Sequence, residues 1–223
     1  MAQEIEIKLK ITEAKAFRLK LKHLGAELVG TGSGRVHEWN VLFDTPERAL
    51  AKNGQLLRIR TETLQPKTKR RRTNSSRPGK PQRFLLTFKR PIAETSAPAN
   101  PARQPNRHKV REELELEVTS AIDLARIFEG LGMKGWFRYE KYRTTFRLPA
   151  SVRWAKGLLI ELDETCIGTF VELEGPAEAI DRAAKKLGYS TRDYILQNYL
   201  SLYFEDCRQR GQKPGDMVFE RTK

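Results

Sequence analysis

The chain has 223 residues, of which 39% are hydrophobic and 31% are charged, and its formal net charge is +14. This length and composition predict a soluble globular protein that can bury a core in one large domain or two small ones. No apolar run reaches about 18 residues, and acids occupy the N-terminus where a signal peptide needs basic and then apolar residues, so neither a membrane-spanning helix nor a secretory signal is expected. Cys166 and Cys207 lack any disulfide or zinc motif, which favours ordinary thiols in a reducing cytoplasm.

The positive charge is concentrated in one segment. Residues 66–83 contain eight Lys or Arg residues and no acid, so more than half of the net charge lies there. The Pro, Ser and Gly content and the low hydrophobicity of this segment predict a flexible, solvated loop. Clustered basic residues also bind phosphate backbones without sequence preference, so weak binding of a polyanion such as a nucleic acid is the alternative interpretation.

The first predicted element is a strand over residues 3–10, in which charged and apolar side chains alternate. Successive side chains of a strand point to opposite faces, so one face carries Glu4, Glu6 and Lys8. By itself, this pattern is typical of an amphipathic strand whose charged face meets water. The alternative is a charged face that points inward and binds a metal ion and an anion.

Helices and further strands follow along the chain. Residues 12–24 are predicted to form a helix that Thr12 caps and Gly25 ends. A short helical turn is expected at 45–52. Strand patterns occur at 40–44, 55–60, 83–89, 109–118, 136–148, 157–163 and 168–175, and helical patterns at 121–131, 176–187 and 192–208. Residues 91–107 are rich in Pro and Ala and predict a second flexible insert, and the tail after Gly211 is expected to fray.

About eight strands share the same alternation between an apolar face and a charged face. Strands of this number and length suit a closed antiparallel barrel. If helices cover the apolar faces from outside, the charged faces line a central tunnel. The sequence therefore predicts an α+β fold that is mainly β, with a barrel and external helices.

Two kinds of charged group fall on the predicted inner faces. The acids are Glu4, Glu6, Glu113, Glu115, Glu117, Glu161, Asp163, Glu172 and Glu174, and the bases are Lys8, Arg58, Arg60, Lys89, Arg111, Lys141 and Arg143. Carboxylate clusters provide the oxygen ligands that Mg²⁺ and Mn²⁺ prefer, and Arg and Lys bind phosphate oxygens. Together they predict a site for a metal-bound polyphosphate. The alternative is a sheet face covered by weak, exposed salt bridges.

The sequence resembles the CYTH superfamily, the triphosphate tunnel metalloenzymes, which include thiamine triphosphatases, inorganic triphosphatases and class IV adenylyl cyclases. The family signature Glu-x-Glu-x-Lys stands here as Glu4, Glu6 and Lys8. Further motifs follow in family order: Phe43-Asp44-Thr45, Leu57-Arg58-Ile59-Arg60, Thr87-Phe88-Lys89, Arg111-Glu112-Glu113-Leu114-Glu115, Lys141-Tyr142-Arg143, Leu162-Asp163 and Gly168-x-Phe170-Val171-Glu172-Leu173-Glu174. The first motif is weak alone, but the ordered set covers about residues 3–175 and is specific.

The resemblance implies an eight-stranded antiparallel β-barrel tunnel in a single domain over residues 1–210, with flexible inserts at about 64–82 and 91–108 and a tail at 211–223. It implies Mg²⁺ or Mn²⁺ bound by Glu4, Glu6, Glu172 and Glu174, with Asp163 and Glu115 as further candidate ligands. The implied triphosphate-binding residues are Lys8, Arg58, Arg60, Lys89, Arg111, Lys141 and Arg143. The implied catalytic residues are Glu4, Glu6, Lys8 and Lys89.

The expected function is that of a metal-dependent enzyme that hydrolyses inorganic triphosphate or a nucleoside or organic triphosphate. A class IV adenylyl cyclase, which converts ATP to cyclic AMP and pyrophosphate, is the first alternative. A non-catalytic binder of polyphosphate or nucleic acid is the second. The expected partner is a small molecule that contains a triphosphate, such as inorganic triphosphate or ATP, with weak polyanion binding through residues 66–83 as an addition. The protein is expected to be cytoplasmic, away from membranes, and a monomer or homodimer.

Other features of the sequence carry less chemistry. Tyr194, Tyr199 and Tyr203 stand at near-helical spacing, which is typical of packing residues. His23, His37 and His108 are scattered without metal-ligand spacing, so we expect no role for them in a metal site.

Overall fold

Nine β-strands form one sheet in the computed structural model, which describes residues 2–30, 33–65, 82–92 and 107–220. The strands are β1 (Ala2–Ile11), β2 (Glu27–Leu28), β3 (Arg35–Asp44), β4 (Leu56–Leu64), β5 (Gln82–Pro91), β6 (Lys109–Val118), β7 (Lys134–Arg147), β8 (Leu159–Thr165) and β9 (Gly168–Glu174). Most of the two expected inserts, at about 64–82 and 91–108, lies outside the described residues.

The sheet closes on itself. Its strand order is β2-β7-β3-β4-β5-β6-β1-β9-β8, every pairing is antiparallel, and an additional pairing between β7 and β8 joins the two ends. The eight-stranded antiparallel barrel expected from the sequence is therefore confirmed. The short strand β2 adds to the outside of this closed ring by pairing with the end of β7.

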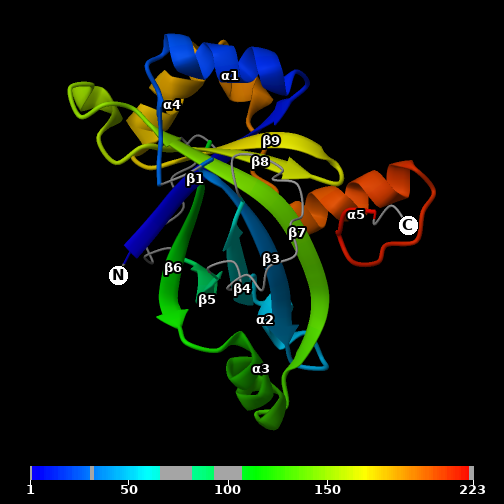
Figure 1. Cartoon of the computed structure of the whole chain (residues 1–223). Helices are drawn as coiled ribbons and strands as arrows, with labels where there is room; N and C mark the ends of the chain where they lie inside the picture. The colour runs from blue at the N-terminus through cyan, green and yellow to red at the C-terminus, as the bar shows by residue number, and fades with distance from the viewer. Residues whose placement is uncertain (1, 31–32, 66–81, 93–106, 221–223) are drawn as a thin grey trace, which may run out of the picture.

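Five α-helices in the described part of the chain lie outside the barrel (Figure 1). They are α1 (Ala14–His23), α2 (Ala49–Lys52), α3 (Ala121–Gly130), α4 (Ala177–Lys186) and α5 (Tyr199–Gln209), and short 3₁₀ turns occupy Arg153–Ala155 and Thr191–Asp193. No helix among the described residues is long and apolar enough to cross a bilayer.

The apolar strand faces point outward and pack under the helices. The largest cluster joins Ile7 and Leu9 of β1 to Phe17 of α1 and Ile180 of α4, and all four side chains are buried. A second cluster packs α3 through Phe128 against the outer faces of β3 and β4. Burying these faces leaves the charged faces of the same strands directed into the barrel.

A third cluster fills one end of the barrel. Leu42, Tyr139 and Phe170 come from three barrel strands, and they pack around Tyr199 of α5 and Met217 of the C-terminal tail. The helix α5 therefore covers this end. Its first turn is fixed by Asn198, whose Oδ1 accepts a hydrogen bond from the Ser201 N–H at 2.8 Å.

Two helix predictions need correction. The helix α1 starts after Glu13 without any side-chain cap, so the cap expected at Thr12 is absent. The helix expected at 192–208 is a 3₁₀ turn, an extended stretch and α5. The extended stretch exists because Ile195 exchanges two backbone hydrogen bonds with Lys8, at 2.9 and 3.0 Å, and so satisfies main-chain groups of β1.

The expectation of a frayed tail after Gly211 was wrong. Met217 is fully buried, its N–H donates to Arg138 O at 2.9 Å, and its carbonyl accepts from Glu140 N at 3.0 Å. Residues 216–219 of the tail therefore lie along the edge of β7.

Replacing Met217 by Ala should lower the free energy of unfolding by about 2–4 kcal/mol, because a fully buried side chain leaves a cavity that the fold refills only in part. Chemical denaturation measures this change. The exposed tail variant Lys213→Ala should stay within about 0.5 kcal/mol of the parent protein. Equal effects of the two substitutions would show that the tail does not belong to the folded core.

Candidate active site

A cavity of about 740 Å³ occupies the barrel interior. Its described lining contains nine acids, Glu4, Glu6, Glu38, Glu62, Glu113, Glu115, Glu161, Glu172 and Glu174. It also contains nine bases, Lys8, Arg58, Arg60, Arg83, Lys89, Lys109, Arg111, Lys141 and Arg143. Every site residue expected from the sequence lies in this lining except Asp163, which is fully buried in the wall behind it.

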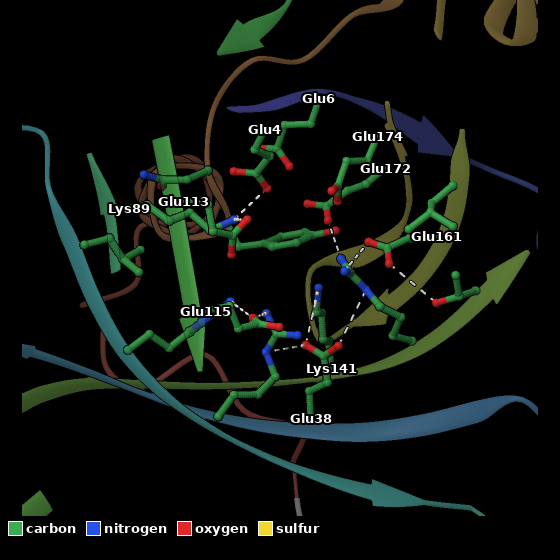
Figure 2. A pocket seen from close by; sticks show the side chains of 18 of the residues that line it. Glu4, Glu6, Glu38, Lys89, Glu113, Glu115, Lys141, Glu161, Glu172 and Glu174 are labelled. Carbon is green, nitrogen blue, oxygen red and sulfur yellow. Dashed lines mark hydrogen bonds and ion pairs between the residues drawn. The ribbon is translucent and has the colours of Figure 1, made fainter. Parts of the chain in front are cut away.

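One wall of the cavity is acidic. The neighbouring strands β1, β9 and β8 carry Glu4, Glu6, Glu172, Glu174 and Glu161 on their inner faces, and Figure 2 shows these carboxylates together on one side of the cavity. Strand register explains the grouping, because Glu6 is opposite Glu174 and Glu161 is opposite Glu172. Like charges at opposed positions destabilise a sheet, so this wall needs positive partners.

Lysines neutralise part of the acidic wall. Lys8 Nζ lies 2.9 Å from Glu172, and Lys109 forms an ion pair with Glu6. Burial opposes ionisation of Glu6, but Lys8 and Lys109 outweigh it, together lowering the pKa of Glu6 to about 2. The pKa of Glu172 is also held well below its ordinary value; burial works against this shift, and Lys8 and Arg143 drive it.

The remaining carboxylates of this wall lack full compensation. Glu4 Oε1 accepts from Lys89 Nζ at 2.6 Å, but its Oε2 is buried without a hydrogen-bond partner among the described residues. Burial and the nearby Glu161 and Glu4 raise the pKa of Glu174 to about 8. Burial raises the pKa of Glu161 to about 7 even though Arg143 touches it. The carboxyl groups of this wall that lack full compensation by positive charge are therefore Glu4, Glu161 and Glu174.

Arginines dominate the opposite wall. Arg58 donates through Nη1 to the Tyr139 hydroxyl at 2.9 Å and through Nη2 to Thr87 Oγ1 at 3.1 Å. Arg60 lies 3.8 Å from both Glu38 and Glu115. These contacts hold two guanidinium groups on the inner face of β4, where they can present planar, bidentate donors to phosphate oxygens.

Glu115, an expected metal ligand, and Arg111, an expected triphosphate-binding residue, have surroundings unlike those of the other expected ligands and binding residues. Glu115 belongs to the basic wall, because its carboxylate accepts from Thr87 Oγ1 at 3.1 Å and lies 4.0 Å from Arg58. Arg111 donates to the Gly54 carbonyl at 2.7 Å and so ties β6 to the turn before β4.

A buried network joins the two walls. Asp163 accepts from Arg143 Nε at 2.7 Å, from Arg143 Nη2 at 2.6 Å, from Lys141 Nζ at 2.8 Å and from the Tyr199 hydroxyl at 2.7 Å. These four donors occupy both of its oxygens. Glu38 lies 3.5 Å from Lys141 Nζ and 3.6 Å from Arg143 Nε. Two buried anions thus hold Lys141 and Arg143 in place.

Within the described residues, no three or more Asp, Glu, His or Cys side chains converge in an arrangement ready to hold a metal ion. Ion pairs explain this, because Glu4, Glu6 and Glu172 each turn toward a lysine. Coordination of an ion by this wall would require the carboxylates to exchange lysine partners for the metal.

A comparison with known families identifies the group to which this protein belongs. The CYTH domain model matches residues 2–199. The chain belongs to the CYTH family. A relative from Methanocaldococcus jannaschii, named provisionally as an adenylate cyclase, is 24% identical over 203 residues, which cover 89% of this chain and 97% of the relative.

Solved structures share the CYTH fold of this chain. A Vibrio parahaemolyticus protein, also described provisionally as an adenylate cyclase, has a TM-score of 0.64 at 18% identity and covers 89% of this chain and 96% of its own. A Hippeastrum protein has a TM-score of 0.50 at 18% identity, with coverage of 95% and 97%. It is described as a provisional adenylyl cyclase with a dominant triphosphatase activity.

The lining residues of this CYTH lumen include five that are absent from the charged groups and site residues expected from the sequence: Glu38, Glu62, Arg83, Lys109 and Tyr199. Lys109 shares the inner face with the expected residues Arg111 and Glu113 of β6, so the alternation along that strand already pointed to it. Glu38 was missed because β3 begins at Arg35, five residues before the predicted strand. Tyr199 enters from α5, and helical spacing alone does not distinguish it from the other tyrosines.

The CYTH protein should lose stability as pH rises through the titration of Glu174. Its pKa is about 8 in the folded state and near 4.5 when unfolded, so the folded state keeps a proton that the unfolded state releases in this window. The stabilisation is complete below pH 4.5 and is lost above pH 8. In chelator-containing buffer at pH 9, Glu174→Gln should therefore raise the unfolding free energy by about 1–3 kcal/mol.

Thermal and chemical unfolding between pH 5 and pH 9 measure this difference. The exposed α3 variant Glu129→Gln is the matched control and should follow the parent protein across the range. A Glu174→Gln variant that loses as much stability as the parent between pH 5 and pH 9 would contradict the raised pKa of Glu174.

Proposed function

We propose that this CYTH protein is a divalent-metal-dependent enzyme that hydrolyses a small molecule containing a triphosphate, such as inorganic triphosphate or a nucleoside triphosphate. The observation that carries the proposal is the division of one cavity into an acidic wall on β1, β9 and β8 and a facing wall with Arg58 and Arg60, with Lys141 and Arg143 of β7 in the network that joins the two walls. A metal–triphosphate complex is complementary to this division, because its metal ion can face the acidic wall while its phosphate oxygens face the basic wall.

The donor set of the acidic wall suits Mg²⁺ or Mn²⁺. Both ions prefer hard oxygen ligands, and the wall offers carboxylates without imidazole or thiolate. The partnerless Oε2 of Glu4 and the raised pKa of Glu174 both indicate a need for positive charge. We therefore assign the ion to Glu4, Glu6, Glu172 and Glu174. When bound, the ion would neutralise phosphate charge and orient the triphosphate for reaction.

The basic wall would bind the phosphates. Arg58 and Arg60 supply guanidinium groups, and Lys141 and Arg143 are held by buried anions, so these cations need little rearrangement on binding. Preorganised donors of this kind stabilise the charge that develops during phosphoryl transfer, which needs positioning more than covalent help. Lys8 and Lys89 pair with wall carboxylates, and we propose that they contact the reacting phosphates.

In the proposed reaction, a water oxygen forms a bond to the terminal phosphorus as the bridging phosphorus–oxygen bond breaks. Orthophosphate and the shortened phosphate chain leave, and the proton of the attacking water passes to solvent or to a product phosphate. The role of the protein is to exclude bulk water and to hold the triphosphate extended between the two walls, with the attacking water in line with the bond that breaks.

Adenylyl cyclisation is the second candidate, favoured by the name of the 24% identical relative. There the ribose 3′-hydroxyl attacks the α-phosphorus of ATP and pyrophosphate leaves. A cavity of about 740 Å³ falls in the usual range for small-molecule sites, so size does not exclude a nucleotide. We place hydrolysis ahead of cyclisation because it requires the charged walls and a water molecule but no nucleoside site. In addition, triphosphatase activity dominates in the structurally similar Hippeastrum protein.

Product analysis separates the candidates. Incubated with tripolyphosphate or ATP and Mg²⁺ or Mn²⁺, the protein should release orthophosphate, and a chelator should stop the release. Ion chromatography and mass spectrometry of the products measure this. Cyclic AMP with pyrophosphate would establish the cyclase instead, and tight binding without any product would leave a polyphosphate binder.

Removing charge from each wall should give different kinetic signatures. Glu4→Gln should raise the Mg²⁺ or Mn²⁺ concentration needed for half-maximal activity by about tenfold or more, because it removes a carboxylate of the acidic wall. Arg58→Ala should instead raise KM for the triphosphate by about 10–100-fold at saturating metal. Steady-state kinetics over a grid of metal and substrate concentrations measure both.

Glu117→Gln is the matched control, because Glu117 belongs to the same predicted acid set but its side chain is 62% exposed and outside the cavity lining. It should leave both parameters unchanged. If Glu4→Gln and Arg58→Ala both behaved like this control, the two-wall assignment would fail.

A further inference from the structure

The helix α5 brings one tyrosine hydroxyl into the barrel. Tyr199 is the first residue of α5, it is 7% exposed, and it lines the cavity. Its hydroxyl donates to Asp163 Oδ2 at 2.7 Å, across 36 positions in the sequence. The cap at Asn198 and the cluster around Phe170 fix where this helix begins. The hydroxyl position is therefore determined by tertiary packing.

The ring of Tyr199 lies beside two lysines of the site. Lys8 Nζ is 5.1 Å and Lys141 Nζ is 5.2 Å from the ring centroid, both within the range of cation–π attraction. The Phe170 ring meets it edge-on at 5.7 Å. An aromatic ring at this position thus supports the ammonium groups from the closed end of the barrel.

The Tyr199 hydroxyl donates to Asp163, the carboxylate that holds Lys141 and Arg143. Asp163 Oδ2 accepts from three donors, which are Tyr199, Lys141 Nζ at 2.8 Å and Arg143 Nη2 at 2.6 Å. A neutral donor takes up part of the charge of this oxygen and fixes the plane of the carboxylate. Without it, Lys141 and Arg143 would be the only donors to that oxygen among the described residues, and Asp163 would draw both cations away from the cavity.

We propose that Tyr199 is a positioning residue of the triphosphate site, acting through Asp163 on Lys141 and Arg143. This inference rests on the proposed function, because it gives these two cations a phosphate to bind. Tyr199 contacts no reacting atom in this account. It sets the orientation of the groups that do.

The other two tyrosines of the same stretch provide matched controls. The Tyr194 hydroxyl donates to Asp181 Oδ1 at 2.9 Å on α4, outside the barrel. The Tyr203 hydroxyl donates to the Asp216 carbonyl at 3.2 Å in the tail. Tyr194→Phe removes one hydroxyl hydrogen bond, and Tyr203→Phe removes two, because the Tyr203 hydroxyl also accepts from Gly215 N–H at 3.3 Å. Of the three hydroxyl groups, only that of Tyr199 reaches the cavity.

The test is the affinity of Tyr199→Phe for tripolyphosphate, measured by calorimetry in the presence of Mg²⁺, together with the melting temperature. The dissociation constant should rise by about 5–20-fold, since a hydrogen bond to a charged group is lost while the ring keeps its packing. Tyr194→Phe and Tyr203→Phe should stay within about twofold, with melting temperatures similar to that of Tyr199→Phe. An unchanged dissociation constant for Tyr199→Phe would overturn the inference.

A double-mutant cycle distinguishes positioning from general structural support. In an Asp163→Asn background, Tyr199→Phe should change the dissociation constant by less than about twofold, because the hydroxyl acts through that carboxylate. The same 5–20-fold factor in both backgrounds would show that Tyr199 acts by another route. If the parent protein itself bound no tripolyphosphate, the proposed function would fail, whereas normal parent binding with an unaffected Tyr199→Phe variant would remove this inference alone.

Discussion

The bidentate ion pair between Arg143 and Asp163 is the contact on which both the barrel and its site depend. The two residues are directly opposite in the pairing of β7 with β8, which is the pairing that closes the sheet into a barrel. Their groups meet at 2.6 and 2.7 Å, with Asp163 fully buried and Arg143 at the cavity surface. A buried ion pair is tolerated only when its remaining hydrogen-bonding capacity is used, and Lys141 and Tyr199 complete that of Asp163. The same pairing of β7 with β8 thus closes the barrel and positions the cations of the site.

Enclosing so many charges carries a large desolvation cost. Nine acids and nine bases line the described cavity, and the balance of sign makes the enclosure possible. The balance is uneven in space, however, because the acids gather on β1, β9 and β8. Burial, together with the neighbouring carboxyl groups of Glu161 and Glu4, raises the pKa of Glu174 in this wall. The apolar outer faces of the same strands, packed under α1 and α4, supply the favourable burial that offsets the cost.

A lumen of this kind suits a ligand that carries both signs of charge. A divalent cation alone would satisfy the acidic wall and leave Arg58 and Arg60 paired with carboxylates of their own wall, which are Glu38, Glu62 and Glu115. A polyphosphate alone would add negative charge and leave the carboxyl groups of the acidic wall without further compensation. The two together match both walls, which is why the metal and the triphosphate belong to a single proposal.

Much of this arrangement could be predicted from alternation along the sequence. The inner positions of Glu4, Glu6 and Lys8 follow from period two, and the repeated pattern in the other strands indicated the barrel. Alternation reports which face a side chain occupies, but not which distant element covers the end of a barrel. Tyr199 was therefore treated like Tyr194 and Tyr203, since their spacing along the chain is similar and only tertiary packing separates them.

The missed residues have local physical reasons. Glu38 follows a glycine-rich stretch that interrupts the strand pattern of the sequence. In the structure, β3 begins at Arg35 and therefore already includes Glu38. Met217 lies in a polar tail whose composition is typical of fraying, and its burial depends on backbone pairing with β7 and on packing against Tyr139 and Tyr199, which no local pattern encodes. In both cases long-range pairing outweighed the local preference.

The most direct test of the two-wall account is a crystal structure of the protein with Mn²⁺ and tripolyphosphate, in which anomalous scattering locates the metal. The account predicts a manganese peak among Glu4, Glu6, Glu172 and Glu174, with phosphate density extending toward Arg58 and Arg60. A manganese peak away from these carboxylates, or a triphosphate bound outside the barrel, would contradict it.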